Sequence, residues 1–235
     1  MNESTQPIIV DLPLRGEWSC PNTPGTKVPS HGTDQFAQRY AYDFMMVDWN
    51  RKEQVFFEGS AWRYFLLGVP LNKCLGWGKP VHAPCDGEIL TAADGYKERQ
   101  PVHLVRDLLI AWKNAFTFNP EKVGLQPVAG NHIIMRFGNT YALLAHLQRG
   151  SICVRQGQRV KKGDILGRVG HSGNSTAPHL HFQLMDSPDP LTAQGLPCAF
   201  TYFERFENGV WKPVEGGMPT DKDRFRLLET EGNVL

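Results

Sequence analysis

The stretch NSTAPHLHFQL, residues 174–184, decides the fold, because two histidines separated by a single residue lie inside an apolar run. Side chains two residues apart on a β-strand point to the same face, so His179 and His181 share a face. The leucines and the phenylalanine that alternate with them take the opposite face and anchor the strand in a core. The histidine face is then free to line a cleft, and two imidazoles that face one way indicate a metal site or an acid-base site.

The composition predicts a globular chain with a packed core, since 41% of its 235 residues are hydrophobic and 11% are aromatic. Lysine and arginine number 25 against 24 aspartates and glutamates, a net charge of +1. The chain has no surplus of basic residues that would favour binding to nucleic acid or to an anionic membrane. No stretch of about 18 apolar residues and no signal-peptide pattern occur. We therefore expect a soluble monomer, cytoplasmic as given, without an integral membrane segment or a nucleic-acid partner.

The cysteines favour reduced thiols over a disulfide framework. Their number is odd, they are widely separated, and none forms a Cys-x-x-Cys pair. We expect each to be a small buried apolar residue and not a metal ligand or a nucleophile. They are Cys20, Cys74, Cys85, Cys153 and Cys198.

Short strands separated by glycine-containing turns predict a mainly β fold. After Gly130 the expected strands are 132–137, 141–147, 151–154, 164–170 and 180–184. Such alternation is typical of an antiparallel β-sheet or β-sandwich. Upstream, residues 40–47 predict a strand buried on both faces with Asp43 in its middle, and Asp86-Gly87 indicates a hairpin within 80–90.

Helical spacing interrupts the strand pattern once. Apolar residues at Val105, Leu108, Leu109, Trp112 and Phe116 predict an amphipathic helix inserted between strands. We expect this apolar stripe to cover an edge or face of the sheet.

The domain organisation that we expect is a single β domain with two extensions. Residues 1–30 form an N-terminal extension, residues 31–186 form the domain with insertions near 50–79 and 93–127, and residues 187–235 form a C-terminal extension packed on the same domain. The 50–79 insertion is irregular, with room for a short helix. The C-terminal extension is expected to be partly ordered, with a short strand near 200–206.

Several segments in fixed order resemble the lysostaphin-like (LytM-type) zinc metalloendopeptidases that carry a His-x-His motif. They are YALLAHL at 141–147, VKKGDILG at 160–167 and GNSTAPHLHF at 173–182, preceded by KPV at 79–81 and YDF at 42–44. The resemblance covers most of residues 31–186. It implies a barrel-sandwich hybrid β fold, one zinc ion per chain, and hydrolysis of peptide bonds in the stem or cross-bridge peptides of bacterial peptidoglycan.

The resemblance also implies roles for five residues. The second histidine of the His-x-His pair, His181, matches a metal ligand, and the first, His179, matches a catalytic histidine. His146 matches the other catalytic histidine. Asp43 matches the ligand aspartate, and His31 is the candidate for the first ligand because no other histidine precedes Asp43.

Asp34 is an alternative to Asp43 as the carboxylate ligand. Eleven residues separate His31 from Asp43, whereas Asp34 lies close to His31 in His-Gly-Thr-Asp. However, polar Gln35 follows Asp34 and no strand begins there. We favour Asp43 and interpret residues 32–42 as a loop insertion. If Asp43 were no ligand, it would be a buried carboxylate paired with an arginine such as Arg39 or Arg136.

Two imidazoles and one carboxylate suit a catalytic zinc, which takes three protein ligands and a water. Zinc lowers the pKa of that water toward about 7 and polarises a carbonyl. No His-Glu-x-x-His helix supplies a glutamate base. Proton transfer therefore falls to His179 as general base, with His146 orienting water or stabilising the oxyanion, although these two roles can be exchanged. The remaining histidines, His82, His103, His132 and His171, we interpret as ordinary hydrogen-bonded residues.

Two other functions compete with the peptidase. The chain can be an inactive binding or regulatory module whose 50–79 insertion covers the cleft. It can also be a phosphocarrier of the sugar-transport IIA type, which uses two facing histidines on a β-sandwich. Tight zinc argues against the carrier, and peptide cleavage argues against the inert module. A wall substrate implies action in the cell envelope or outside the cell, which the missing export signal leaves open.

Overall fold

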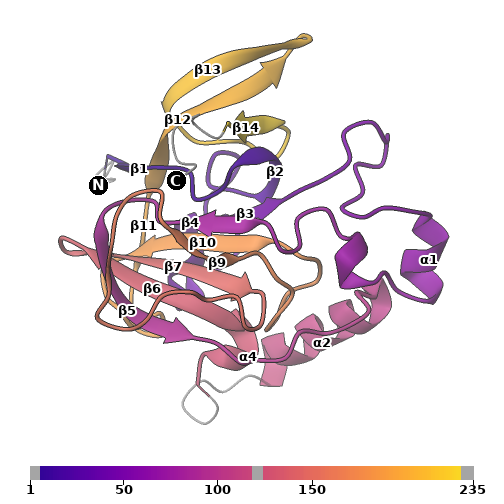
Figure 1. Cartoon of the computed structure of the whole chain (residues 1–235), viewed down its shortest axis with the longest axis horizontal. Coiled ribbons are helices and arrows are strands. Elements are labelled where there is room, and N and C mark those ends of the chain that lie inside the picture. The colour runs from indigo at the N-terminus through magenta and orange to yellow at the C-terminus, as the bar shows by residue number, and fades with distance from the viewer. Residues whose placement is uncertain (1–5, 118–123, 229–235) are drawn as a thin grey trace.

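One large, mostly antiparallel sheet dominates the protein (Figure 1). The computed structural model describes residues 6–117 and 124–228. Ten strands follow one another in the order β1-β12-β14-β2-β3-β10-β7-β6-β5-β8, with β11 beside β10 and β13 beside β12, while β4 and β9 form a separate pair. The mainly β fold class is thereby confirmed.

The strands are β1 (Ile8–Val10), β2 (Gly16–Asn22), β3 (Tyr42–Met45), β4 (Pro80–His82), β5 (Gly87–Ala93), β6 (Asn131–Phe137), β7 (Thr140–Leu147), β8 (Arg159–Val160), β9 (Ile165–Arg168), β10 (Leu180–Met185), β11 (Gly195–Leu196), β12 (Cys198–Glu207), β13 (Val210–Gly217) and β14 (Phe225–Leu227). The helices are α1 (Ala61–Leu66), α2 (Leu104–Thr117), α4 (Gln126–Ala129) and the 3-10 helices η1 (Gln35–Tyr40) and η2 (Leu71–Lys73). None of the helices among the described residues has the length and apolar character needed to cross a membrane.

Strand β10 lies at the centre of the sheet, between β3 and β7, and its register places the histidine face. His181 lies opposite Asp43 on β3 and opposite Ala145 on β7. Phe182, on the other face, has no exposed surface and packs in the main core. Strand β10 therefore has the predicted alternation, with one face packed in the core and the other face lining a cleft.

The segments at the two ends of the chain belong to the sheet. Strand β1 pairs in parallel with β12, and β14 pairs with both β12 and β2. The β12–β13 hairpin extends beyond the rest of the sheet (Figure 1). The expectation of one short strand near 200–206 was too modest, because β11, β12, β13 and β14 all lie in the C-terminal region.

Two predicted strand features are wrong. Residues 151–154 form no strand. Asp86-Gly87 is not a hairpin turn, because β4 pairs with β9 whereas β5 pairs with β6 and β8. The Asp86 carboxylate instead accepts hydrogen bonds from the Lys161 Nζ, at 2.7 Å, and the Lys162 backbone N–H, at 2.8 Å. These contacts tie the turn to the segment between β8 and β9.

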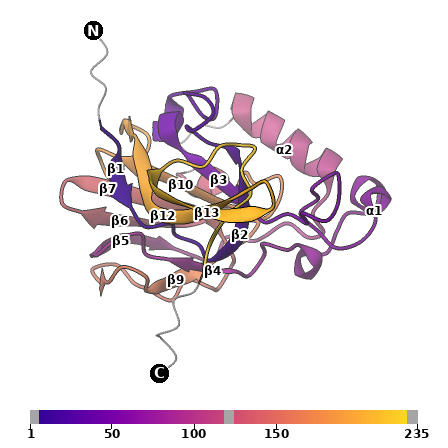
Figure 2. The same ribbon diagram turned by 90° about the horizontal axis from the view of Figure 1, so that it is seen from above.

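Helix α2 contains every residue of the predicted apolar stripe, but the described part of that stripe faces outward. Val105, Leu108, Leu109 and Trp112 are 49–68% exposed, and the side chain of Phe116 lies outside the described part. Asp107, on the other side of the helix, has no exposed surface. Figure 2 shows α1 and α2 together at one margin of the molecule. The expectation that the stripe covers the sheet is therefore wrong, because an ion-paired carboxylate occupies the inward face.

The remaining expectations concern cysteines and loops. All five cysteines are free thiols; Cys20, Cys74 and Cys198 are buried and Cys85 is half-buried, but Cys153 is exposed, contrary to expectation. The 50–79 insertion carries α1, η2 and a small core of its own around Phe57. The 32–42 segment, expected to be a loop, contains η1.

Candidate active site

Three side chains from separate segments meet at the centre of the sheet. His31 precedes η1, Asp43 lies on β3 and His181 lies on β10. One Asp43 oxygen, Oδ2, is 2.9 Å from His31 Nε2, and the other, Oδ1, is 2.9 Å from His181 Nδ1. One potential ligand atom of each residue lies within 4.8 Å of the others. Donors of this kind and number suit a zinc site with an open fourth position.

Hydrogen bonds on the outer side of each imidazole determine which ring nitrogen carries the proton. The Gln183 Nε2 donates to the Phe36 carbonyl at 2.8 Å, so Gln183 Oε1 accepts from His181 Nε2, also at 2.8 Å. The Ser30 hydroxyl donates to the Gln38 carbonyl at 3.1 Å, so its oxygen accepts from His31 Nδ1 at 3.0 Å. These partners assign bare nitrogens to His181 Nδ1 and His31 Nε2.

The bare nitrogens both face the Asp43 carboxylate, which is an arrangement of acceptors only. Such acceptors repel one another unless the rings take up extra protons or a cation lies between them. A divalent cation would bind all of these atoms at once. Burial alone would raise the pKa of Asp43, but the neighbouring histidines, His179 foremost, hold it well below its ordinary value. The carboxylate is thus ionised, as a ligand must be, and these residues fit a zinc ion.

The alternative partners for this aspartate are engaged elsewhere. Asp34 is exposed and forms an ion pair with Arg39 at 2.8 Å. Arg136 forms an ion pair with Glu88 at 2.7 Å. Neither arginine therefore neutralises Asp43, and Asp43, not Asp34, lies beside His31.

Two further histidines flank the three. His179 Nδ1 is 2.7 Å from the Ala177 carbonyl, and His146 Nδ1 is 2.9 Å from the Ser172 carbonyl. Because a carbonyl only accepts, each Nδ1 donates, and in the neutral form of each ring Nε2 is left bare. The His179 Nε2 faces the ligand group at 3.5 Å from Asp43 Oδ1. The two rings are neighbours, with centroids 4.6 Å apart.

His146 has two further properties of a functional residue. Its backbone φ is +63°, a left-handed conformation that is uncommon for residues other than glycine and that clusters at active sites. Burial lowers the pKa of His146 well below its ordinary value, and the nearby imidazoles of His179 and His181 lower it further. The imidazole is therefore neutral near pH 7.

A cleft of about 450 Å³ opens over these five residues. Its other lining residues come from the η1 region, the segment around α4, the loops on either side of β10, and strands β7 and β10. They include Thr33, Gln35, Phe36, Leu125, Val128, Asn174, Thr176 and Pro190. No described residue of the 50–79 insertion is among them, so this insertion does not cover the cleft.

The sequence interpretation missed the residues that hold the five in place. His82 and His132 are ordinary hydrogen-bonded residues, each with its Nδ1 2.9 Å from a backbone carbonyl. His171, which was grouped with them, instead lies between Asp107 and Ser175, 3.3 Å and 3.1 Å away. A histidine between two glycines in Gly-His-Ser-Gly, just upstream of the His-x-His strand, was the one signal available. Gln183, on the same strand face as both histidines, could have been predicted from its spacing.

Comparisons with known proteins match the part of the chain that carries three of these five residues. Residues 120–193 match the model of Peptidase family M23, a segment that contains His146, His179 and His181 but not His31 or Asp43. Peptidoglycan DD-endopeptidase ShyA of Vibrio cholerae is 39% identical over 67 residues, which are 28% of this chain and 15% of that protein. Peptidoglycan DD-endopeptidase ShyC of the same organism is 39% identical over 119 residues, 49% of this chain and 25% of that protein.

Among solved structures, the catalytic domain of the antimicrobial peptidase lysostaphin from Staphylococcus simulans matches at 21% identity. The match covers 77% of this chain and 88% of that domain, with a TM-score of 0.38. The chain matches a quarter or less of the length of the two Vibrio relatives.

Proposed function

We propose that the chain is a member of Peptidase family M23, whose model matches residues 120–193, and that it is a zinc-dependent endopeptidase that hydrolyses peptide bonds in peptidoglycan. The peptidase unit that we propose comprises residues 31–186, with the flanking strands packed on it. The observation that carries the proposal is the convergence of two bare imidazole nitrogens on an ionised, buried Asp43, beside two more histidines in one cleft.

His31 Nε2, Asp43 and His181 Nδ1 would hold one zinc ion per chain. Bound there, zinc would supply an acidified water near neutral pH and would polarise a substrate carbonyl. Ser30 and Gln183 orient the two ligand rings by accepting their outer N–H groups. Asn22 Nδ2 donates to Asp43 Oδ2 at 2.8 Å and so orients the carboxylate.

His179 is the general base in this proposal. Its Nδ1–H is engaged by Ala177, and its bare Nε2 faces the ligand group, so this nitrogen can take a proton from water and return it to the leaving amine. His146 presents a second bare Nε2 beside it. A neutral imidazole there can orient the water or the substrate without adding a positive charge that would repel zinc.

The substrate proposed is a cross-bridge peptide, in keeping with the peptidoglycan DD-endopeptidases that the chain resembles. The open cleft, with apolar residues beside polar Gln35 and Asn174, suits an extended peptide. We expect no nucleic-acid partner, because the net charge is only +1. We also propose that the protein acts as a monomer.

The two competing functions are less compatible with the site. An inert module covered by the 50–79 insertion does not agree with a cleft to which that insertion contributes no described residue. A phosphocarrier histidine must accept a phosphoryl group, yet an ionised carboxylate lies 2.9 Å from both His31 and His181 and would repel it.

The experiment that tests the proposal measures new amino groups released from purified peptidoglycan by the zinc-loaded protein. Directly cross-linked and glycine-bridged walls are compared, and mass spectrometry of the products identifies the bond. His179→Ala is run beside the wild type. We expect release that depends on His179, and no release from either wall type would refute the proposed substrate.

A second pair of variants tests the division of roles. We expect His181→Ala to abolish zinc binding, whereas His179→Ala leaves zinc bound and removes activity, because only His181 is a ligand. Metal analysis of the purified variants gives the stoichiometry. Equal loss of zinc in both variants would contradict the assignment.

A further inference from the structure

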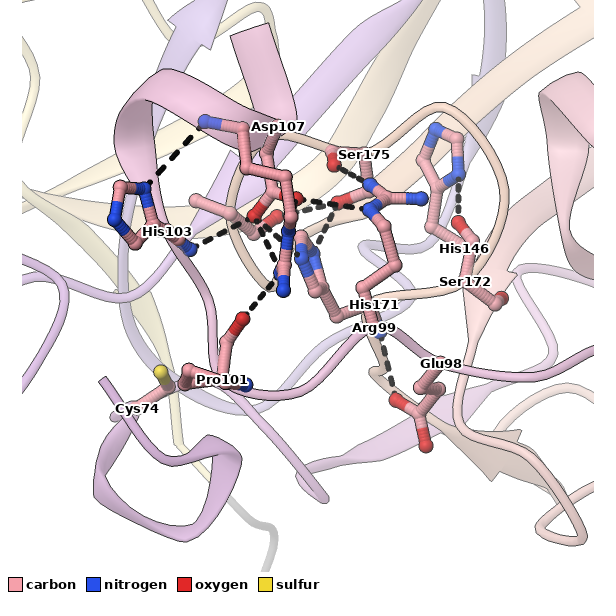
Figure 3. Close-up of polar contacts among 12 residues, drawn as sticks. Cys74, Glu98, Arg99, Pro101, His103, Asp107, His146, His171, Ser172 and Ser175 are labelled. Atoms are coloured by element: carbon pink, nitrogen blue, oxygen red, sulfur yellow. Dashed lines mark hydrogen bonds and ion pairs between the residues drawn. The ribbon is translucent and has the colours of Figure 1, made fainter. Parts of the chain in front are cut away.

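We propose that Asp107 and His171, acting through Ser175, position the catalytic histidine His179. The inserted helix α2, which carries Asp107, thereby contributes to the geometry of the active site. The proposal rests on the peptidase function above and extends it. Neither Asp107 nor His171 touches the cleft, so both are positioning residues and not catalytic ones. Figure 3 shows Asp107, His171 and Ser175 with their polar contacts.

A continuous series of polar contacts leads from the helix to the catalytic ring. Asp107 Oδ2 is 3.3 Å from His171 Nε2, and His171 Nδ1 is 3.1 Å from Ser175 Oγ. Ser175 Oγ is in turn 3.2 Å from His179 Nδ1 and 2.6 Å from the Ala177 carbonyl that accepts from the same nitrogen. All of these side chains are buried. Because these groups are shielded from bulk water, each contact restrains the next.

The same carboxylate also holds the backbone of the loop formed by residues 170–176. Arg99 Nε donates to Asp107 Oδ1 at 2.9 Å, and the Arg99 guanidinium donates to the carbonyls of Gly173 and Ser175 (Figure 3). Because a guanidinium is planar, an ion pair on one edge fixes the direction of its other N–H groups. Asp107 thereby orients the group that restrains two loop carbonyls.

Both catalytic histidines depend on this 170–176 loop. His146 Nδ1 donates to the Ser172 carbonyl at 2.9 Å, whereas His179 is held through Ser175. The loop is also restrained at its start, where the His171 backbone N–H donates to Glu98 Oε1 at 2.8 Å (Figure 3). A displacement of the loop would therefore move the donors and acceptors of both rings together.

The unusual orientation of α2 agrees with this role. A helix that served only to cover the sheet would turn its apolar stripe inward, yet here the stripe is exposed and Asp107 is buried. Burying a carboxylate is unfavourable unless it is fully paired. Asp107 accepts hydrogen bonds from Arg99, Arg106 and the His103 backbone N–H as well as lying beside His171. The inward face of the helix is thus built around one ionised side chain that contacts the loop.

The test compares Asp107→Asn and Ser175→Ala with a matched control, Ser19→Ala, in the zinc-loaded protein. Ser19 is also buried and donates its hydroxyl to a backbone carbonyl, that of Met45, but belongs to β2. We expect both test variants to keep full zinc stoichiometry and to lower kcat about 10- to 100-fold, with KM changed less than twofold, because misplacing a general base affects the chemical step. The control should keep its kcat.

The second readout does not depend on catalysis. Nitrogen-15 spectra of the imidazole rings should show the single Nδ1–H tautomer at His179 in the wild type and a mixture, or a shifted ring signal, in the two test variants. If Asp107 has a purely structural role, Asp107→Asn will have a lower unfolding temperature but unchanged ring signals and an unchanged kcat per zinc-loaded molecule. This result would overturn the proposal.

The two proposals can fail separately. If the wild type cleaves no peptidoglycan, the proposed function fails, but the His179 ring signals still decide whether Asp107 and Ser175 position the histidine. If Asp107→Asn does not fold, the ring signals of Ser175→Ala test the positioning instead, since this variant removes one buried hydroxyl and leaves the Arg99–Asp107 ion pair intact. Unchanged ring signals in Ser175→Ala would then refute the positioning.

Discussion

Replacing Gln183 with leucine should weaken zinc binding although Gln183 is not a ligand. Its amide links the Phe36 carbonyl to His181 Nε2, with 2.8 Å at each contact, and this link leaves His181 Nδ1 bare toward Asp43. Leucine has a similar volume but no polar atoms. The variant should therefore fold, while nothing specifies the tautomer or the rotation of the His181 ring.

The magnitude follows from the burial of the contact. Gln183 is only 1% exposed, so water cannot replace its oxygen at His181 Nε2. Loss of such an outer partner of a metal-bound histidine costs about 10- to 100-fold in metal affinity. This range corresponds to roughly 1.4 to 2.8 kcal/mol of binding free energy, at about 1.4 kcal/mol for each factor of ten. We expect the upper part of the range, because a buried N–H left without a partner adds its own penalty.

Competition with a chelating dye of known zinc affinity measures the change. Ser19→Ala again serves as the control: it removes a buried hydrogen bond in the same sheet, costs about 1 kcal/mol of unfolding free energy, and should leave the zinc affinity at the wild-type value. A Gln183→Leu protein that is folded and binds zinc within twofold of the wild type would refute the argument that outer hydrogen bonds assign the bare nitrogens.

Three other predictions concern stability. Burial would raise the pKa of Asp107, but hydrogen bonds from His171, the His103 backbone and Arg106 hold it below its ordinary value. The stability that the ionised carboxylate contributes is therefore present above about pH 4 and is lost on further acidification. Urea unfolding from pH 6 to pH 3 should show a smaller acid-induced loss in Asp107→Asn than in the wild type. Leu109→Gln, on the exposed stripe, should change the unfolding free energy by less than about 0.5 kcal/mol, whereas Phe182→Ala in the core should cost about 3 to 5 kcal/mol; equal effects would contradict the outward orientation of α2. Gly173→Ala should lower the free energy of unfolding by more than about 1 kcal/mol, because φ is +67° and the added Cβ would lie 2.3 Å from the Gly130 nitrogen; a wild-type thermal midpoint would count against this.

The central strand could be predicted from the sequence because its signal is local. A period of two residues assigns His179 and His181 to one face, and the apolar alternates assign the other face to the core. The same reasoning applied to Asp43 in its apolar strand. What the period could not give is which strands become neighbours, and the cross-strand position of Asp43 opposite His181 emerges only from the sheet register.

The errors have one physical origin, which is that long-range pairing overrides local pattern. The apolar stripe on α2 has the right period for a covering helix, but the fully paired Asp107 takes the inward side. Asp86-Gly87 has the composition of a hairpin turn, but lysines distant in sequence bind its carboxylate. His171 was undervalued for the same reason, since its partner Asp107 lies 64 residues away.

The cross-strand position of Asp43 and His181 also has a consequence for the order of events in folding. The two residues are 138 positions apart, and a slip of one residue between β3 and β10 would turn the Asp43 side chain to the other face. The proposed zinc site therefore cannot form until a distant pairing is correct, and such pairings form late because they carry a large loop-closure cost. Zinc should accordingly slow the unfolding rate much more than it speeds refolding. The ion would stabilise the completed native register, and it would not stabilise a shifted sheet in which Asp43 and His181 no longer lie on the same face.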